Sequence, residues 1–280
     1  MIIFEFVLII FLVSIFAGVF GSIVGLGGGV VIIPVLTLLL GVDIHFAIGA
    51  SIVAIIGTSS GAASTYVKDK ITNLRVGMFL ELGSASGAIV GAAVAAYANS
   101  AALELVFGVI LIASLVPTIL KIGEEIPKSP ELKGLSKRLS LKGSYPERDG
   151  KTIEYNTTRP AAGLIGTAVA GVLSGLLGIG GGAFKVLGMD LGMKLPMKVS
   201  TTTSNFMIGV TAAASAGIYF VRGDVNPLLV APVALGILIG AAIGARILLR
   251  SRNRTVRLVF ALVLAVTAVQ MILGALGVTV

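Results

Sequence analysis

The sequence has no cysteine and no tryptophan, one histidine, and only 12% charged residues. Without cysteine, disulfide bonds and thiolate metal sites are excluded, and a single histidine cannot build a histidine-rich metal site. Soluble domains carry about 25% charged residues. With 56% hydrophobic residues and a mean hydropathy of +1.05, the chain is expected to be an integral membrane protein in a lipid bilayer.

The sequence contains several long apolar segments. A helix needs about 20 apolar residues to span a bilayer, whereas a transmembrane strand shows about ten alternating ones. The segments here are long and do not alternate, so they predict an all-α polytopic membrane protein with about 8–10 transmembrane helices. The apolar runs are 2–24, 46–66, 76–98, 102–120, 161–177, 199–221, 227–249 and 256–276.

A glycine-rich motif occurs twice. Residues 25–29 (GLGGG) return 153 residues later as residues 178–182 (GIGGG). Each glycine costs roughly 1 kcal/mol in a helix interior, so both motifs predict a break in a helix. The apolar segment 30–40 that follows is too short to cross a bilayer. The break is therefore expected inside the membrane, where irregular backbone is buried in protein or lines a wet cavity.

The repeat divides the chain into a first transmembrane repeat (1–121), a polar loop (122–158) and a second transmembrane repeat (159–280). The linking region from 121 to 159 holds nine Lys or Arg and six Asp or Glu. About 39 polar residues cannot bury enough apolar surface to fold unaided. We therefore expect a cytoplasmic loop here, without a third domain.

The net charge of +8 is unevenly distributed. In a soluble chain it would suggest nucleic acid, but no nucleic-acid motif accompanies it, and membrane proteins gather positive charge in cytoplasmic loops. Placing the central loop in the cytoplasm puts 19 of the 21 Lys and Arg on that side, leaving Arg222 and Lys185. Equivalent turns of the two repeats then carry opposite charge bias. This predicts two inverted-topology repeats in the cell membrane, with both termini outside.

Inverted repeats with a broken helix at matching positions are typical of secondary transporters, in which the substrate binds near the membrane midplane. No Gly-Lys-Ser/Thr sequence follows either glycine motif, so ATP-driven transport within this chain has no support. No cofactor is expected.

The glycine motif with Pro34 five residues after it, its repeat, and the segment 198–207 resemble the sulfite exporter TauE/SafE family. Residues 203–207 (TSNFM) are the most specific part, and the resemblance covers nearly the whole chain. It implies transport of sulfur-containing anions such as sulfite, thiosulfate or organosulfonates like sulfoacetate across the cytoplasmic membrane, usually outward. Leu187 stands where the repeat and the family lead one to expect proline, which bears more on substrate details than on the fold.

An anion suits the residues around the two motifs. Successive glycines can present several backbone N–H groups to a negative charge, and a helix that begins after them adds the positive end of its dipole. Nearby Ser, Thr and Asn side chains would supply further donors; alternatively, these groups bond the backbone of their own helices. The expected substrate-binding residues are Gly27, Gly28, Gly29, Ser51, Gly180, Gly181, Gly182, Lys185, Thr202, Thr203, Ser204 and Asn205.

Two charged residues that are expected at membrane depth carry functional hypotheses. Lys185 follows the second motif by three residues and is expected to be a cationic anchor for the anion; the alternatives are pairing with Asp190 or snorkelling to the outer surface. Glu81 is the candidate for a coupling proton, because intramembrane carboxylates commonly mark proton paths. The alternative for Glu81 is a structural ion pair with Arg75.

Glycines also form a stripe at Gly83, Gly87 and Gly91, which returns 153 residues later. Small residues at this spacing let two helix backbones approach closely. We expect packing between helices of one chain, with a homodimer as the alternative. Asp43 and His45 lie in a predicted outer turn, where a solvated structural role is favoured over metal binding, so no metal site is expected.

Two other functions stay open. One is a channel or carrier for another small anion or a metal ion, although a metal carrier should show clustered His, Asp or Met ligands. The other is a polytopic intramembrane enzyme, which would need paired carboxylates or a histidine-rich metal site. The acidic residues are scattered, so the prediction is a transporter and no enzyme.

Overall fold

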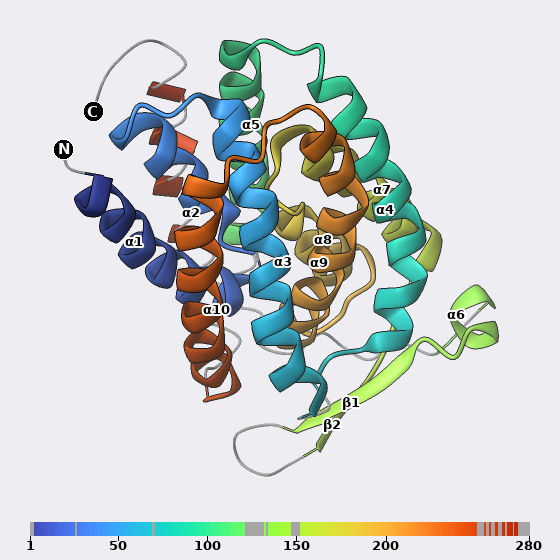
Figure 1. The fold of residues 1–280 in the computed structure, drawn as a ribbon. Coiled ribbons are helices and arrows are strands. Elements are labelled where there is room, and N and C mark those ends of the chain that lie inside the picture. The colour runs from blue at the N-terminus through green and yellow to red at the C-terminus, as the bar shows by residue number, and fades with distance from the viewer. Residues whose placement is uncertain are drawn as a thin grey trace.

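The computed structural model describes residues 3–25, 27–68, 71–120, 132, 134–146 and 152–250, and scattered positions between 255 and 273. Two short segments of wider, π-type helical turns are labelled η. In chain order the elements are α1 (Ile3–Val24), α2 (Gly29–Pro34), η1 (Val35–Leu39), α3 (Ile44–Lys68), α4 (Leu74–Ala95), α5 (Ser100–Leu120), α6 (Gly134–Arg138), β1 (Lys142–Pro146), β2 (Thr152–Asn156), α7 (Pro160–Leu177), α8 (Gly182–Leu187), η2 (Gly188–Gly192), α9 (Met197–Val221) and α10 (Pro227–Arg250) (Figure 1).

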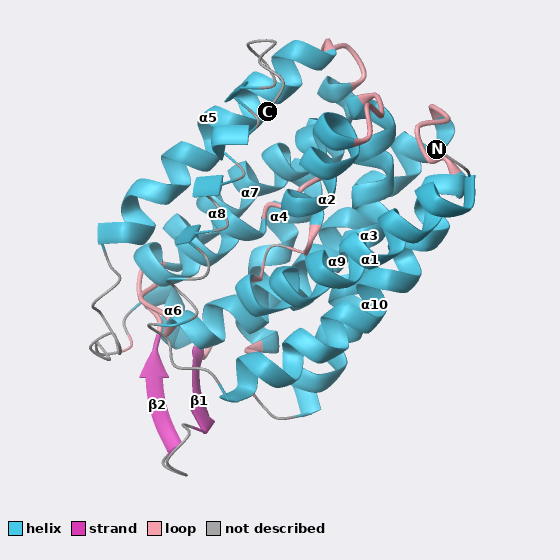
Figure 2. Cartoon of the chain, turned by 90° about the vertical axis from the view of Figure 1, so that its left-hand side faces the viewer, coloured by secondary structure: helices cyan, strands magenta, loops and turns pink. Residues whose placement is uncertain are grey.

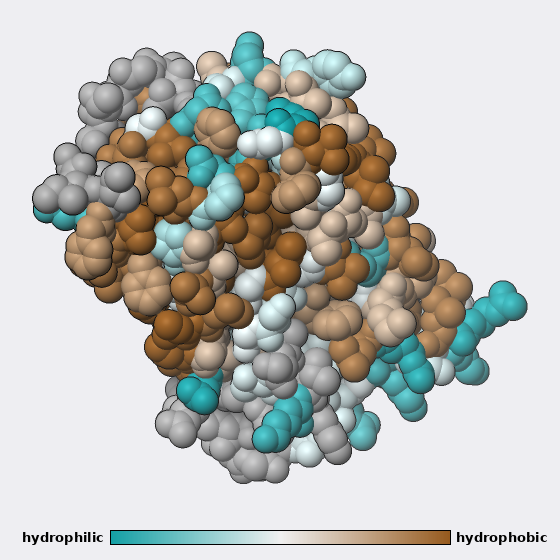
Figure 3. Space-filling model, viewed as in Figure 1, coloured by the Kyte–Doolittle hydropathy of each residue, from teal (hydrophilic) through white to brown (hydrophobic). Residues whose placement is uncertain are grey.

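Among the described residues, six helices are long and apolar enough to cross a bilayer: α1, α3, α4, α7, α9 and α10. α5 has 21 residues, and the last expected apolar run, 256–276, falls largely outside the described residues. Apolar side chains cover much of the face seen in Figure 3, and hydrophilic ones gather toward its upper and lower ends. The prediction of an all-α, multi-pass membrane protein is confirmed.

The order of elements repeats along the chain. α2, η1, α3 and α4 each have a counterpart, α8, η2, α9 and α10, that begins 153 residues later. The predicted helix break is present in both units, because a short helix follows each glycine motif. The π-type turns form after Pro34 in the first unit and after Leu187 in the second. The proline is therefore not required for this geometry.

The helices of each unit pack mainly against helices of the other unit. α1 lies along α10 and α4 lies along α7, while α3 and α9 pack together between them (Figures 1 and 2). A Cβ on Gly87 would overlap the carbonyl oxygen of Ala168, and a Cβ on Gly240 would overlap that of Ile15. Both glycine stripes are therefore used for close helix packing within the chain, as expected.

α3 and α9 run in opposite directions. The turn before α4 lies at the start of α9, because the Asn73 N–H donates to Thr203 Oγ1 over 3.0 Å. The equivalent turn before α10 lies near the start of α3, where a Cβ on Gly49 would overlap the carbonyl oxygen of Asp224. A helix of 25 residues is about 37 Å long. The two equivalent turns therefore lie at opposite ends of the bundle (Figure 1).

The linking region contains ordered structure that the sequence did not predict. β1 and β2 form an antiparallel hairpin next to α6 (Figure 2). Leu141, Tyr145 and Tyr155 are buried in one apolar cluster with residues of α4, η2 and α9. The segment cannot bury enough surface by itself, but the ends of the membrane helices supply the apolar partners that it lacks.

Candidate functional site

Both glycine motifs form left-handed turns that join two helices. At the matching positions Gly27 and Gly180, φ is +79° and +72°, a region that side chains other than glycine rarely adopt. A Cβ on Gly27 would lie 2.8 Å from Ile208 Cδ1, and a Cβ on Gly180 would lie 3.2 Å from Ile55 Cγ2. Conformation and packing thus require glycine here whatever the substrate is. Positive φ angles also occur at Gly25, Gly28, Gly178 and Gly181.

Two serines at equivalent positions of the repeats hold the loops together. Ser51 Oγ of α3 donates to the carbonyl oxygen of Gly178 over 2.5 Å, and Ser204 Oγ of α9 donates to that of Gly25 over 2.9 Å. Each central helix therefore binds the glycine loop of the other unit. Ser204 Oγ also lies 3.4 Å from the carbonyl oxygen of Gly182. The structure thus brings the two predicted loops to one place between the repeats.

The other predicted side chains of α9 have different partners. Asn205 Nδ2 donates to the carbonyl oxygen of Ser22 over 2.7 Å, at the end of α1. Thr202 Oγ1 donates to the carbonyl oxygen of Val199 over 3.1 Å, within its own helix. Thr203 accepts the hydrogen bond from the turn before α4 described above. The alternative of bonding to the own helix therefore holds for Thr202, whereas the other two brace neighbouring segments.

Two buried hydroxyls in the same Ser/Thr run have no hydrogen-bond partner among the described residues. They belong to Ser200 and Thr201, whose side chains are 0% exposed. A Cβ on Gly25 would lie 3.0 Å from the carbonyl oxygen of Thr201, so this residue lies against the first glycine loop. A buried polar group without a partner costs about 1–3 kcal/mol. The sequence predicted donors in this run, including Thr201 but not Ser200.

Lys185 is the centre of a buried polar cluster. Its side chain is 0% exposed, and its Nζ donates to Thr211 Oγ1 and lies 3.9 Å from Glu81 Oε2. Thr211 Oγ1 donates to Glu81 Oε1 over 2.6 Å and lies 2.9 Å from Ser84 Oγ. Lysine and glutamate therefore share one hydroxyl, although they come from different repeats.

The structure gives both charges a partner. Complete burial of Lys185 excludes snorkelling, and Lys185 forms an ion pair with Glu81. The Arg75 guanidinium is engaged elsewhere, since its Nη1 donates to the carbonyl oxygen of Ser140 over 3.4 Å. The candidate anchor and the candidate coupling residue thus belong to a single site.

Several residues of this region were not predicted, although the repeat distance identifies them. Tyr66 OH donates to the carbonyl oxygen of Ser22 over 3.0 Å, and Tyr219 OH donates to that of Gly175 over 2.5 Å. The two tyrosines are 153 residues apart and bond equivalent carbonyls. A polar residue that occurs at the same position of both units is therefore a signal for bracing of the glycine loops.

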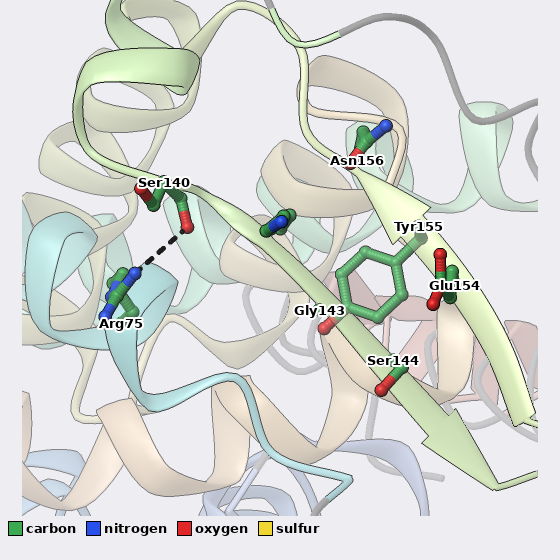
Figure 4. A pocket seen from close by; sticks show the side chains of 8 residues that line it. Arg75, Ser140, Gly143, Ser144, Glu154, Tyr155 and Asn156 are labelled. Carbon is green, nitrogen blue, oxygen red and sulfur yellow. Dashed lines mark hydrogen bonds between the residues drawn. The ribbon is translucent and has the colours of Figure 1, made fainter.

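The described surface also has open cavities. One of about 320 Å³ lies where the β-hairpin meets α4, and Figure 4 shows Arg75, Glu154 and Tyr155 around it. It is a surface groove with charges of both signs, and none of the predicted binding residues lines it. The residues of the glycine loops are buried instead. The two glycine loops are thus packed inside the protein between the repeats.

The outer turn with Asp43 and His45 is a local contact. His45 Nδ1 lies 2.9 Å from Asp43 Oδ1 at the surface. Partial burial raises the pKa of Asp43, but hydrogen bonds from His45 outweigh it and hold this pKa below its usual value. Within the part of the chain that the structure describes, no group of three or more His, Cys, Asp or Glu could hold a metal ion.

Comparison with known proteins gives a consistent result. A family model described as "Sulfite exporter TauE/SafE" matches residues 10–271. Three curated relatives are each named "probable membrane transporter protein". YunE of Bacillus subtilis (strain 168) is 30% identical over 275 residues, which are 96% of this chain and 97% of the relative. YdhB of the same organism is 27% identical over 241 residues, 85% of this chain and 89% of the relative. MJ0441 of Methanocaldococcus jannaschii is 25% identical over 292 residues, 96% of this chain and 98% of the relative. No solved structure matches the chain.

Proposed function

Because the chain belongs to the sulfite exporter TauE/SafE family, we propose that it is a secondary transporter of sulfur-containing anions in the cytoplasmic membrane. Its relatives are named as membrane transporters, and this chain is one as well. The proposed substrates are sulfite, thiosulfate or organosulfonates such as sulfoacetate, and the proposed direction is export. One observation carries the substrate class: the lysine that follows the second glycine loop is fully buried, with the hydroxyl of Thr211 at its ammonium group.

The donor set fits a small oxyanion. Such an anion has several acceptor oxygens and no donors, so it needs a cation together with several N–H or O–H groups. Lys185 supplies the charge, and the hydroxyl of Thr211 lies at its ammonium group. The unused hydroxyls of Ser200 and Thr201 lie about 15 Å further along α9, so they would meet the anion at another point of its path. Burial of a charged lysine in a membrane protein is costly, by a few kcal/mol on insertion scales. A bound anion offsets part of this cost, which gives the buried lysine a function.

Alternating access would come from movement of the two repeats against each other. The glycine loops lie between the repeats, and each is held by a serine of the opposite unit. Moving one unit relative to the other would therefore open the loops to one side of the membrane at a time. The opposite location of equivalent turns supports an inverted arrangement. We place the β-hairpin in the cytoplasm and both termini outside, because this satisfies the positive-inside rule.

The alternatives make different demands on the site. A carrier or channel for another small anion would use the same donors but would not prefer sulfur compounds. A metal carrier needs a cluster of metal ligands. The charged residues of the proposed site are instead a lysine and one carboxylate, Lys185 and Glu81. An intramembrane enzyme would turn over its substrate chemically. The three are separated by measuring which compounds cross the membrane unchanged.

The test is flux into proteoliposomes that contain the purified protein. The panel consists of sulfite, thiosulfate, sulfoacetate, taurine and sulfate, with chloride, phosphate and zinc for the alternatives. We expect saturable movement of at least one sulfur-containing anion above the level of protein-free liposomes. Equal flux of chloride or phosphate, or flux of zinc alone, would contradict the proposed substrate class.

A further inference from the structure

The charged cluster around Lys185 has no counterpart in the first repeat. Thr58, the equivalent of Thr211, donates to the carbonyl oxygen of Gly27 over 2.9 Å, whereas Thr211 donates to Glu81. Ile32 and Ala234 occupy the positions equivalent to Lys185 and Glu81. The same fold element therefore packs with an isoleucine in one unit and with an ion pair in the other. Packing alone does not explain the pair, because the first unit achieves it with apolar residues.

The pair also conflicts with binding of an anion. In the present structure Glu81 neutralises Lys185, and a negative substrate at the same ammonium group would place two negative charges beside one cation. Like charges that share a buried site cannot both remain ionised at low cost. A proton on Glu81 removes the conflict, since COO⁻ and H⁺ give a neutral COOH. Glu81 Oε2 is buried and has no hydrogen-bond partner, so it is the oxygen that can take the proton.

We propose that Glu81 and the substrate anion compete for Lys185, so that each anion crosses the membrane together with a proton in the same direction. This rests on the proposed function. In the empty carrier Lys185 pairs with the carboxylate, and in the loaded carrier it pairs with the anion while Glu81 holds the proton. When the anion is released on the other side of the membrane, Glu81 releases its proton to that side as well and pairs with Lys185 again. The ion pair thereby couples proton movement to anion movement, and the equivalent positions, Ile32 and Ala234, contain no such pair.

The other charged groups around Glu81 are too distant or already engaged to replace it. α4 packs along α7, which has no titratable side chain, and along α9, whose titratable residues are Lys198 and Tyr219. At 1.5 Å per residue these two lie about 20 Å and 12 Å along the helix from Thr211. On α4 itself, Arg75 is six residues away and donates to the hairpin. Asp190, five residues after Lys185, is buried in η2. Lys185 is therefore the charge that competes with a proton on Glu81.

The first test measures protons on the unmodified protein. Binding of sulfite and of thiosulfate is followed by isothermal titration calorimetry at one pH in buffers that differ in ionisation enthalpy. The slope of the observed enthalpy against the buffer enthalpy gives the number of protons taken up. We expect about one proton per anion, and an affinity that falls about tenfold per pH unit in the alkaline range. Because no variant is involved, loss of folding cannot account for a negative result.

The second test uses Glu81→Gln, whose amide mimics the protonated carboxyl and can still accept from Thr211. Glu154→Gln, in the β-hairpin, is the matched control for loss of a carboxylate. In proteoliposomes we expect the wild type and the control to accumulate the anion when a pH gradient is imposed. Glu81→Gln should exchange labelled for unlabelled anion but should not respond to the gradient, and its binding should take up no proton.

The outcomes separate the two proposals. Anion binding without proton uptake would overturn the coupling and leave the transport function in place. Proton uptake that persists in Glu81→Gln would also overturn it, because another group would then hold the proton. If no sulfur-containing anion binds or moves at all, the proposed function fails, and the coupling fails with it.

Discussion

Removing Lys185 should affect stability and anion binding separately, and a double variant distinguishes the two effects. Lys185→Met keeps an unbranched side chain of similar length but removes the ammonium group. Glu81 then lies buried without its cation, and breaking a buried pair in this way costs about 3–5 kcal/mol. We expect the melting temperature of the purified single variant to fall accordingly. Anion affinity should fall at least about tenfold, or about 1.4 kcal/mol.

Adding Glu81→Gln to Lys185→Met removes the unpaired charge. Thr211 can donate to the new amide as it donates to Glu81 Oε1 over 2.6 Å. The double variant should therefore regain stability to within about 1.5 kcal/mol of the wild type, the worth of a hydrogen bond. The double variant should still bind anions weakly, because the cation is missing. Lys185→Arg in the wild-type background keeps the cation and should bind anions more tightly than Lys185→Met, but less tightly than the wild type, because the guanidinium is larger and planar. Thermal unfolding and calorimetry measure the two quantities. Wild-type affinity in the stable double variant would refute the role of Lys185 as an anion anchor.

Three further predictions concern topology, packing and the hairpin. Single cysteines at Asn99 and Thr152 should react with a membrane-impermeant maleimide from opposite sides of the membrane, and same-side labelling would contradict the inverted arrangement. Gly91→Ala should destabilise the protein by about 1–3 kcal/mol in thermal unfolding, because its Cβ would overlap a carbonyl oxygen of α7. Gly217→Ala, with nothing within 4 Å, is the control and should be neutral or stabilising. Burial raises the pKa of Tyr155 from 10.0 to about 12. Its contribution to hairpin docking should therefore be constant below about pH 10 and be lost between about pH 10 and 12. Proteolysis of the linking region across this range would show it, and an unchanged pH profile in Tyr155→Phe would contradict it.

Much of the fold follows from features that one chain reveals by itself. Apolar length predicted the membrane helices, and the glycine motifs predicted the helix breaks, because both depend on local chemistry. The stripe with Gly87 was also interpreted correctly, since small residues at helical spacing require a close neighbour. The β-hairpin was missed because its stability comes from apolar surface on distant helices, which no local pattern of the segment reveals.

The sequence predicted which kinds of side chain form the candidate site, but not which groups each side chain contacts. The Ser/Thr run indicated donors, but Ser204 donates to the carbonyl oxygen of Gly25, while the hydroxyls of Ser200 and Thr201 have no partner among the described residues. Glu81 and Lys185 were selected independently as intramembrane charges, and only the fold shows that they meet. Their separation of 104 residues in sequence carries no pairing signal. The repeat distance is the exception, because it identifies equivalent residues of the two units from the sequence alone.

The proposed binding site for a sulfur-containing anion lies between the two glycine loops, beside Lys185. Its most direct test is a crystal structure of the protein soaked with selenite, the selenium analogue of sulfite, with data collected at the selenium absorption edge. We expect an anomalous peak within hydrogen-bond distance of Lys185 Nζ, next to the hydroxyl of Thr211. A peak in the surface groove beside Arg75 and Lys142, with none at the loops, would contradict the proposed site.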